Sequence, residues 1–326
     1  MNERRVDGAD RLLPDPNSTL VMVGNFDGVH RGHQWVLERG LTRARLHQLD
    51  PIVLTFHPHP SEVLGRGTQP VLTPLVRKID LLTRLSPDLT VVVEPFTREL
   101  AAASPRQFAA ELLQQKLGAR MVSVGENFRF GRGRTGDAQS LRALGEELGF
   151  EAHPEALDAD ERGVISSTRI RELITSGAVT AAEKLLGRPH ALSGVVERGE
   201  QRAQTLGVPS ANLGNVPELM PARGVYAVLV DVLDGDTYHR LGPGITNVGV
   251  RPTHGAGDLR AEAHVLGFSG DLYGKSLRIH LVDRLRDERR FGSLDELRAQ
   301  LARDKQEGAE RLEGRVADPR AHGAWH

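Results

Sequence analysis

Apolar runs and amphipathic segments alternate along the first half of the chain. Short apolar runs typical of buried parallel strands occupy residues 20–25, 51–56, 90–96 and 120–125. Segments with the apolar spacing of helices follow them, at 34–47, 74–85, 105–117 and 137–149, with further helices near 168–187. This alternation predicts a doubly wound α/β domain, in which helices cover both faces of a parallel sheet.

The pattern changes after residues 187–189, which read Gly-Arg-Pro. Strand-like runs then occupy 192–199, 224–233, 261–268 and 276–285, with Gly and Pro turns and no helix between them. They predict an antiparallel barrel or sandwich, closed by one helix over 293–313. Ser293 and Glu296 have the spacing of a capping box at the start of that helix. The expected domains are 1–187 and 188–326, with a disordered tail from about 314.

Composition narrows the class of protein. The chain has 326 residues, enough for two domains, and it is 39% hydrophobic and 26% charged, as soluble globular proteins are. A net charge of −1 gives no basic field for nucleic acid or an anionic membrane. The absence of cysteine excludes disulfides and thiolate chemistry. The charged N-terminus lacks a signal-peptide core and no apolar run reaches the ~18 residues of a membrane span, so we expect a cytoplasmic protein.

Two histidines stand where the first strand passes into a helix. They belong to the sequence His30-Arg31-Gly32-His33, directly after the apolar run and its turn. Open α/β sheets bind ligands at the carboxyl ends of strands, and the N–H groups of a helix N-terminus attract phosphate. Gly32 lets the backbone approach an anion closely. The position favours a phosphate site over a pair of surface histidines in a tight turn.

The first half resembles a known enzyme module. It is similar to the adenylyltransferase module of bacterial bifunctional riboflavin kinase/FAD synthetases, which belongs to the His-x-Gly-His nucleotidyltransferases. Four blocks carry the similarity and occur in the family's order: 24–34 (GNFDGVHRGHQ), 55–60 (TFHPHP), 124–131 (VGENFRFG) and 165–171 (ISSTRIR). The resemblance implies transfer of AMP from ATP to FMN. The FMN phosphate is already an anion at pH 7, so positioning and charge stabilisation suffice and no general base is needed.

The resemblance also assigns roles to individual residues. His30, His33 and Arg171 are the expected catalytic groups; the expected ATP contacts are Gly24, Phe26, Asn127, Ser167 and Thr168; and the expected flavin contacts are Phe56 and Phe128. Two alternatives stay open: residues 166–168 also fit an ordinary helix N-cap, and both phenylalanines also fit core packing. Many relatives carry Asp at position 127, and the amide keeps an acceptor there.

The second half resembles the riboflavin kinase module of the same enzymes. The matching blocks are 206–212 (LGVPSAN), 224–226 (GVY), 247–253 (NVGVRPT), 262–264 (EAH) and 272–275 (LYGK). The resemblance implies that Ser210 and Asn212 hold Mg²⁺ and ATP, and that Glu262 is the base on the ribityl hydroxyl. Phosphorylation of a hydroxyl needs a base that takes the hydroxyl proton. Without these blocks a solvated strand residue is the favoured interpretation of Glu262, although it shares one strand face with His264; the blocks reverse that preference.

The kinase half departs from the family pattern at two places. Ser210 replaces the usual Thr, and the segment 201–204 has Gln201, Ala203 and Gln204 where relatives carry a glycine-containing flap. Added Cβ atoms can obstruct phosphate approach. Three hypotheses therefore stay open: a bifunctional enzyme using ATP, Mg²⁺, riboflavin and FMN; an FAD synthetase with a weakened or inactive kinase module; and a non-catalytic flavin-binding regulator. The sequence does not predict the oligomeric state.

Overall fold

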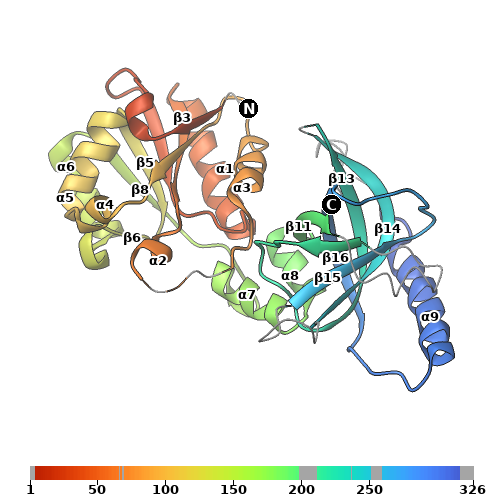
Figure 1. Ribbon diagram of the computed structural model, residues 1–326. Helices are drawn as coiled ribbons and strands as arrows, with labels where there is room; N and C mark the ends of the chain where they lie inside the picture. The colour runs from red at the N-terminus through yellow and green to blue at the C-terminus, as the bar shows by residue number, and fades with distance from the viewer. Residues whose placement is uncertain are drawn as a thin grey trace. The chain divides into compact units, whose positions relative to one another are not determined.

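The computed structural model describes residues 4–65, 67, 70–197, 211–235, 237–250 and 259–315. The chain folds as two compact units (Figure 1). Met1–Gln69 and Thr73–Ser166 form the first, and Pro70–Leu72 with Ser167–His326 form the second. Helices α7 (Ser167–Thr175) and α8 (Val179–Leu186) belong to the second unit, whereas the sequence pattern placed them with the first.

A six-stranded parallel sheet forms the centre of the first unit, as predicted. Its order is β1-β4-β3-β2-β5-β8, with bounds Arg5–Asp7, Thr90–Pro95, Asp50–His57, Thr19–Val23, Ala119–Gly125 and Glu151–Glu155. The central strands match the predicted apolar runs. The two edge strands, β1 and β8, were not predicted because their sequences, RVD and EAHPE, are rich in charge, as edge strands often are.

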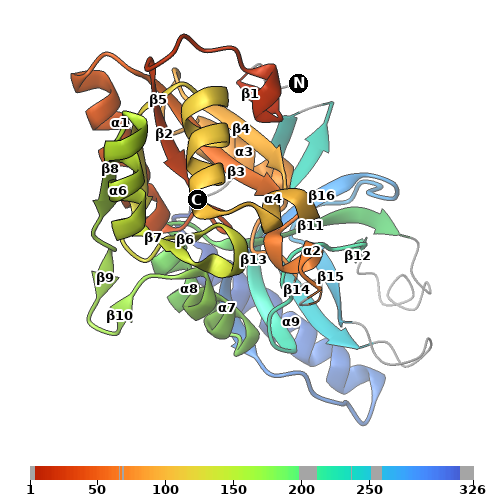
Figure 2. The same ribbon diagram turned by 90° about the vertical axis from the view of Figure 1, so that its left-hand side faces the viewer.

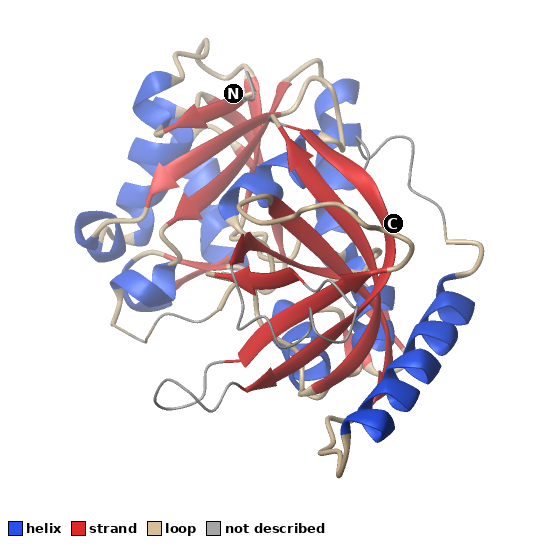
Figure 3. Cartoon of the chain, turned by 45° about the vertical axis from the view of Figure 1, so that its right-hand side comes forward, coloured by secondary structure: helices blue, strands red, loops and turns tan. Residues whose placement is uncertain are grey.

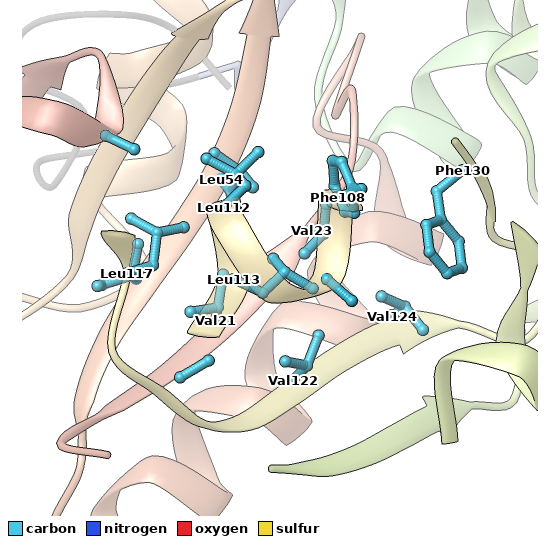
Figure 4. Close-up of a cluster of buried hydrophobic side chains, with 14 of the residues drawn as sticks. Val21, Val23, Leu54, Phe108, Leu112, Leu113, Leu117, Val122, Val124 and Phe130 are labelled. Atoms are coloured by element: carbon cyan, nitrogen blue, oxygen red, sulfur yellow. The ribbon is translucent and has the colours of Figure 1, made fainter. Parts of the chain in front are cut away.

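Helices cover both faces of this sheet (Figure 2). Leu20 and Met22 of β2 pack with α1 (Arg31–Leu46) and α3 (Leu75–Thr83). Val21 and Val23 point the other way, toward α6 (Ala138–Leu148) and the π-helix η2 (Phe108–Lys116) that continues α5 (Pro105–Gln107) (Figure 4). Shorter elements fill the connections: η1 (Ala9–Arg11), α2 (Pro60–Val63), α4 (Arg98–Ala102), β6 (Arg129–Phe130), η3 (Arg132–Arg134), β7 (Gly136–Asp137), β9 (Ala159–Asp160) and β10 (Gly163–Val164).

The second unit is a closed antiparallel barrel rather than a sandwich (Figure 3). Its order is β11-β12-β15-β14-β13-β16, with bounds His190–Glu197, Ala211–Gly214, Leu259–Val265, Thr237–Val250, Gly224–Asp234 and Ser276–Arg286. Strands β12 and β14 were not predicted. The Gly242-Pro243-Gly244 stretch resembles a turn, yet it lies inside β14. A Cβ at Gly244 would come within 2.6 Å of the His264 carbonyl oxygen, so a close strand approach requires glycine there.

The predicted C-terminal helix is α9 (Leu294–Leu312), which packs on the outer face of the barrel. Leu312 contacts Ala227, Leu229 and Val282, and Arg286 forms a two-pronged ion pair with Asp304 at 2.9 and 2.7 Å. The Ser293 Oγ accepts from the Glu296 N–H at 3.2 Å, as the capping box predicts. The Glu296 carboxylate accepts instead from the Gly292 N–H, one residue before the cap. Across the described residues, every helix is too short or too polar to cross a membrane.

Candidate active sites

The His30-Arg31-Gly32-His33 sequence lies where β2 passes into α1, as predicted. His30 is the N-cap residue of α1, and its Nδ1 accepts a hydrogen bond from the His33 N–H at 3.3 Å. Because Nδ1 is the acceptor, Nε2 carries the proton of the neutral ring and can donate to an anion. The first turn of α1 thus combines an imidazole donor with the N–H groups of a helix N-terminus.

The two imidazoles form a stacked pair. Their ring centroids are 3.5 Å apart and their planes differ by 20°, while the Phe26 ring meets His33 edge-on at 5.3 Å. His30 is buried and His33 is half-buried. The stack fixes both rings on one side of the turn, so they can act together on one anionic group.

Backbone geometry in this turn depends on small residues and on strain. A Cβ at Gly32 would lie 3.0 Å from the Ile165 carbonyl oxygen and 3.2 Å from the His30 ring. A larger residue would crowd both groups, so packing within the protein favours glycine here even before an anion binds. Phe26 and Val29 adopt left-handed φ angles of 50° and 39°, which is costly for non-glycine residues and is typical of functional turns.

The Asn127 loop follows β5, the strand beside β2. The chain order of the sheet reverses between these two strands, since β3 and β4 lie beyond β2 and β8 lies beyond β5. Open α/β sheets bind their ligands at such a point. The structure therefore places exposed Asn127 and the histidine pair after the carboxyl ends of two neighbouring central strands, as an ATP site would need.

The two candidate flavin contacts belong to one row of aromatic rings, in which Phe128 is at an end and Phe56 is inside. Phe56 is 9% exposed and packs on Phe96 and Phe108, at centroid distances of 5.8 and 6.4 Å. Phe128 is half-buried and stacks on Phe130 at 5.4 Å. Phe56 is thus a member of the domain core, and Phe128 is the better exposed of the two rings.

A buried lysine beside this turn was not found from the sequence. Lys78 of α3 is 8% exposed, and its Nζ donates to the Asn25 carbonyl oxygen at 3.0 Å and to Thr55 Oγ1 at 3.2 Å. Burial lowers the pKa of Lys78 to about 8, against the opposing attraction of the Asp27 carboxylate. The helical spacing could have predicted its burial, because Lys78 lies three residues after Leu75 and four before Leu82, on the apolar face of the helix.

We expect Lys78 to make the stability of this unit depend on pH. Its pKa is about 8 in the folded chain and 10.5 ordinarily, so the unfolded chain binds more protons between these values. The free energy of unfolding should therefore rise with pH across this window, by up to about 3 kcal/mol relative to Lys78→Met. Urea unfolding of both proteins between pH 7.5 and roughly 10.5 measures the difference. Parallel profiles would contradict the assignment.

The three candidate phosphate contacts on α7 belong to the second unit. Ser167 begins the helix, Thr168 is exposed, and Arg171 donates to the Pro70 carbonyl oxygen. The Pro70–Leu72 segment itself joins the barrel, where the Leu219 N–H donates to the Val71 carbonyl oxygen at 2.8 Å. A guanidinium has five N–H donors, so the bond to Pro70 is compatible with a phosphate contact.

Glu262 lies between two amides on the barrel. It is directly opposite Asn212 of β12 on one side and Asn247 of β14 on the other. Opposite residues on neighbouring strands have Cβ atoms ~5 Å apart and face the same way. Their neighbours Ala261 and Ala263 belong to the barrel interior, so this row of polar side chains lies on the outer face. Asn247 was not predicted as a site residue, because its position depends on strand register.

Ser210 and the flap residues Gln201, Ala203 and Gln204 lie outside the described residues. Within the described part of the chain, no group of three or more His, Asp or Glu side chains could hold a metal ion. Mg²⁺ in kinases is usually held by one or two protein oxygens together with phosphates and water. The amide oxygen of buried Asn212 could be one such ligand. A metal ion that arrives with ATP does not need a cage made of protein ligands alone.

Comparisons with known proteins match each half of the chain to a family. A family model described as FAD synthetase matches residues 13–169, and one described as riboflavin kinase matches residues 186–312. The bifunctional riboflavin kinase/FMN adenylyltransferase of Escherichia coli K12 is 37% identical over 300 residues, covering 91% of this chain and 94% of the relative. The chain belongs to the bifunctional riboflavin kinase/FMN adenylyltransferases.

Other members of the family are similarly related. The proteins of the same name from Pseudomonas fluorescens and Bacillus subtilis are 36% and 34% identical, and the alignments cover 94% and 93% of those chains. A crystal structure named as a macrolide-efflux protein from Streptococcus pneumoniae superposes with a TM-score of 0.81 at 29% identity, covering 94% of this chain and 98% of the other. The fold is thus shared over nearly the whole chain.

Proposed function

We propose that this chain phosphorylates riboflavin to FMN and then adenylylates FMN to FAD, with one ATP consumed in each step. The observation that carries the proposal is that each family segment contains its reactive group in a suitable setting. The first has the stacked His30 and His33 at the start of α1, and the second has Glu262 between two amides on the barrel.

The adenylyl transfer needs no base. An oxygen of the FMN phosphate attacks the α-phosphorus of ATP, the bond from that phosphorus to the bridging oxygen breaks, and pyrophosphate leaves. The His30 Nε2–H and the His33 ring would donate to the α-phosphate oxygens, where charge develops, and the N-terminus of α1 adds its positive end. Asn127 at the same sheet edge would contact the nucleotide, and Phe128 would pack on the flavin. The roles of Gly24, Phe26, Phe56, Ser167, Thr168 and Arg171 stay predictions of the resemblance.

The kinase step needs a proton acceptor. Glu262 would take the proton of the terminal ribityl hydroxyl while the hydroxyl oxygen attacks the γ-phosphorus of ATP. The bond from that phosphorus to the bridging oxygen breaks, and ADP leaves. The Asn247 amide would orient the carboxylate from the neighbouring strand. Asn212 and Ser210 would hold Mg²⁺, which neutralises phosphate charge when bound with ATP. Only small-molecule partners are needed, and we place the enzyme in the cytoplasm.

The test supplies ATP and Mg²⁺ with either FMN or riboflavin. We expect FAD and pyrophosphate in equal amounts from FMN, and FMN followed by FAD from riboflavin, as measured by chromatography. FAD from FMN with no FMN from riboflavin would leave an FAD synthetase with an inactive kinase module. No turnover in either arm would favour the non-catalytic regulator.

A further inference from the structure

Lys78 ties together the carboxyl ends of two neighbouring strands. Its Nζ reaches the carbonyl oxygen of Asn25, just after β2, and the hydroxyl of Thr55 near the end of β3, at 3.0 and 3.2 Å. The Thr55 hydroxyl donates to the same carbonyl oxygen at 3.1 Å. The Asn25 carbonyl therefore accepts two hydrogen bonds, which use both of its lone pairs and hold it turned toward β3 and α3.

The direction of this carbonyl sets the direction of the next N–H group. The Asn25–Phe26 peptide bond is trans and planar, so the Phe26 N–H points away from Lys78 and Thr55. A carbonyl oxygen facing a phosphate would repel it, whereas an N–H attracts it. Lys78 thus holds the Asn25 carbonyl oxygen, which would repel a phosphate, on the side of the peptide opposite to the Phe26 N–H.

The same peptide leads directly into the histidine pair. Phe26 adopts a left-handed φ of 50°, and its carbonyl oxygen accepts from the Val29 N–H at 3.1 Å, which closes the turn before His30. The Phe26 ring contacts the His33 ring edge-on. A rotation of the Asn25 peptide would therefore move both the N–H donor and the ring that supports His33.

Stability alone does not account for a lysine here. An apolar side chain of the same length would fill the space without burying a charge. The carboxylate that attracts the ammonium is Asp27, which belongs to the turn between β2 and α1. From β3 the facing group is the uncharged Thr55, and β4 contributes Val91 and Val93 to this layer of the core. The ammonium is placed where it acts on the backbone of the phosphate-binding turn.

We propose that Lys78 is a positioning residue of the adenylyl-transfer site, which orients the Asn25–Phe26 peptide and through it the Phe26 N–H and the His30–His33 pair toward the triphosphate. The inference rests on the proposed function of this turn. It assigns Lys78 no contact with the substrates, and it predicts that both donors to the Asn25 carbonyl matter.

The test compares Lys78→Met, Lys78→Arg and Thr55→Val with wild type, with Lys116→Met on η2 as the matched control. The kcat for FAD formation from FMN should fall roughly 100-fold in Lys78→Met and about tenfold in Thr55→Val, with smaller changes in the KM for ATP. Lys78→Arg, which keeps the charge and donors, should recover part of the loss. Riboflavin phosphorylation, which occurs in the other unit, should stay within about twofold, and the urea unfolding midpoint of each variant reports whether the first unit is folded.

ATP binding alone separates failure of this inference from failure of the proposed function. Calorimetry should show about tenfold weaker ATP binding in the first unit for Lys78→Met than for wild type, whether or not FAD forms. Wild type that binds ATP without making FAD would overturn the proposed function only. Lys78→Met and Thr55→Val that both match wild type in ATP binding and kcat would overturn the positioning role. A loss of kcat in both variants that is matched by a large fall in the urea unfolding midpoint would indicate unfolding of the first unit and would overturn it as well.

Discussion

His33→Ala is expected to slow FAD formation from FMN by about 10³-fold, because it removes a donor aimed at the developing charge on the α-phosphate. It also removes the ring on which His30 is stacked at 3.5 Å, so the remaining imidazole loses its support. Riboflavin phosphorylation, which occurs in the other unit, should keep its rate. Steady-state rates of pyrophosphate release from FMN and ATP, and of ADP release from riboflavin and ATP, measure the two effects in one preparation.

The matched control is His47→Ala, at the other end of α1. His47 is the exposed C-cap residue of the same helix, so its replacement removes an imidazole without touching the turn after β2. We expect both rates to stay within about twofold of wild type. If His33→Ala behaved like this control, the α-phosphate site would have to lie away from the N-terminus of α1.

Glu262→Gln is expected to lower riboflavin phosphorylation by roughly 10³-fold, since an amide cannot take the proton of the ribityl hydroxyl. The substitution keeps the size of the side chain and its place between Asn212 and Asn247, so the barrel should fold as before. FAD formation from added FMN should be unchanged. Phosphorylation rates with riboflavin as the substrate, together with the unfolding midpoint in urea, distinguish lost chemistry from lost structure.

Glu310→Gln serves as the control for Glu262. Glu310 is an exposed carboxylate on α9 of the same unit, and its neutralisation changes the net charge equally. Its kinase rate should equal that of wild type within about twofold. Retention of kinase activity by Glu262→Gln would show that another group accepts the proton, and the row of polar residues on β12, β15 and β14 would lose its assigned role.

Local patterns were sufficient for the central sheet and for the histidine pair. Buried strands such as β2 and β4 contain continuous apolar runs, LVMV and VVV, and a strand that passes into a helix fixes where residues such as His30 and His33 must lie. Strands that carry charge or glycine were missed. β14 contains Gly242-Pro243-Gly244, which reads as a turn when its neighbours in space are unknown.

Other features depend on contacts between distant residues. Asn247 lies opposite Glu262 only because of the register between β14 and β15, and register is not visible in either strand alone. Lys78 looks like one of several lysines until α3 is packed on the sheet and its Nζ meets Asn25. The sequence also did not show that α7 and α8 join the second unit, because short amphipathic helices fit either side of a domain boundary.

The origin of the two phosphorus atoms in FAD tests most directly whether one chain carries out both steps. Riboflavin and Mg²⁺ are incubated with ATP labelled at the γ-phosphate in one reaction and at the α-phosphate in another. The proposed function predicts that each molecule of FAD takes one phosphorus from a γ-phosphate and one from an α-phosphate, with FMN labelled only in the first reaction. FAD that forms only from added FMN and never carries the γ-label, or no labelled flavin at all, would contradict it.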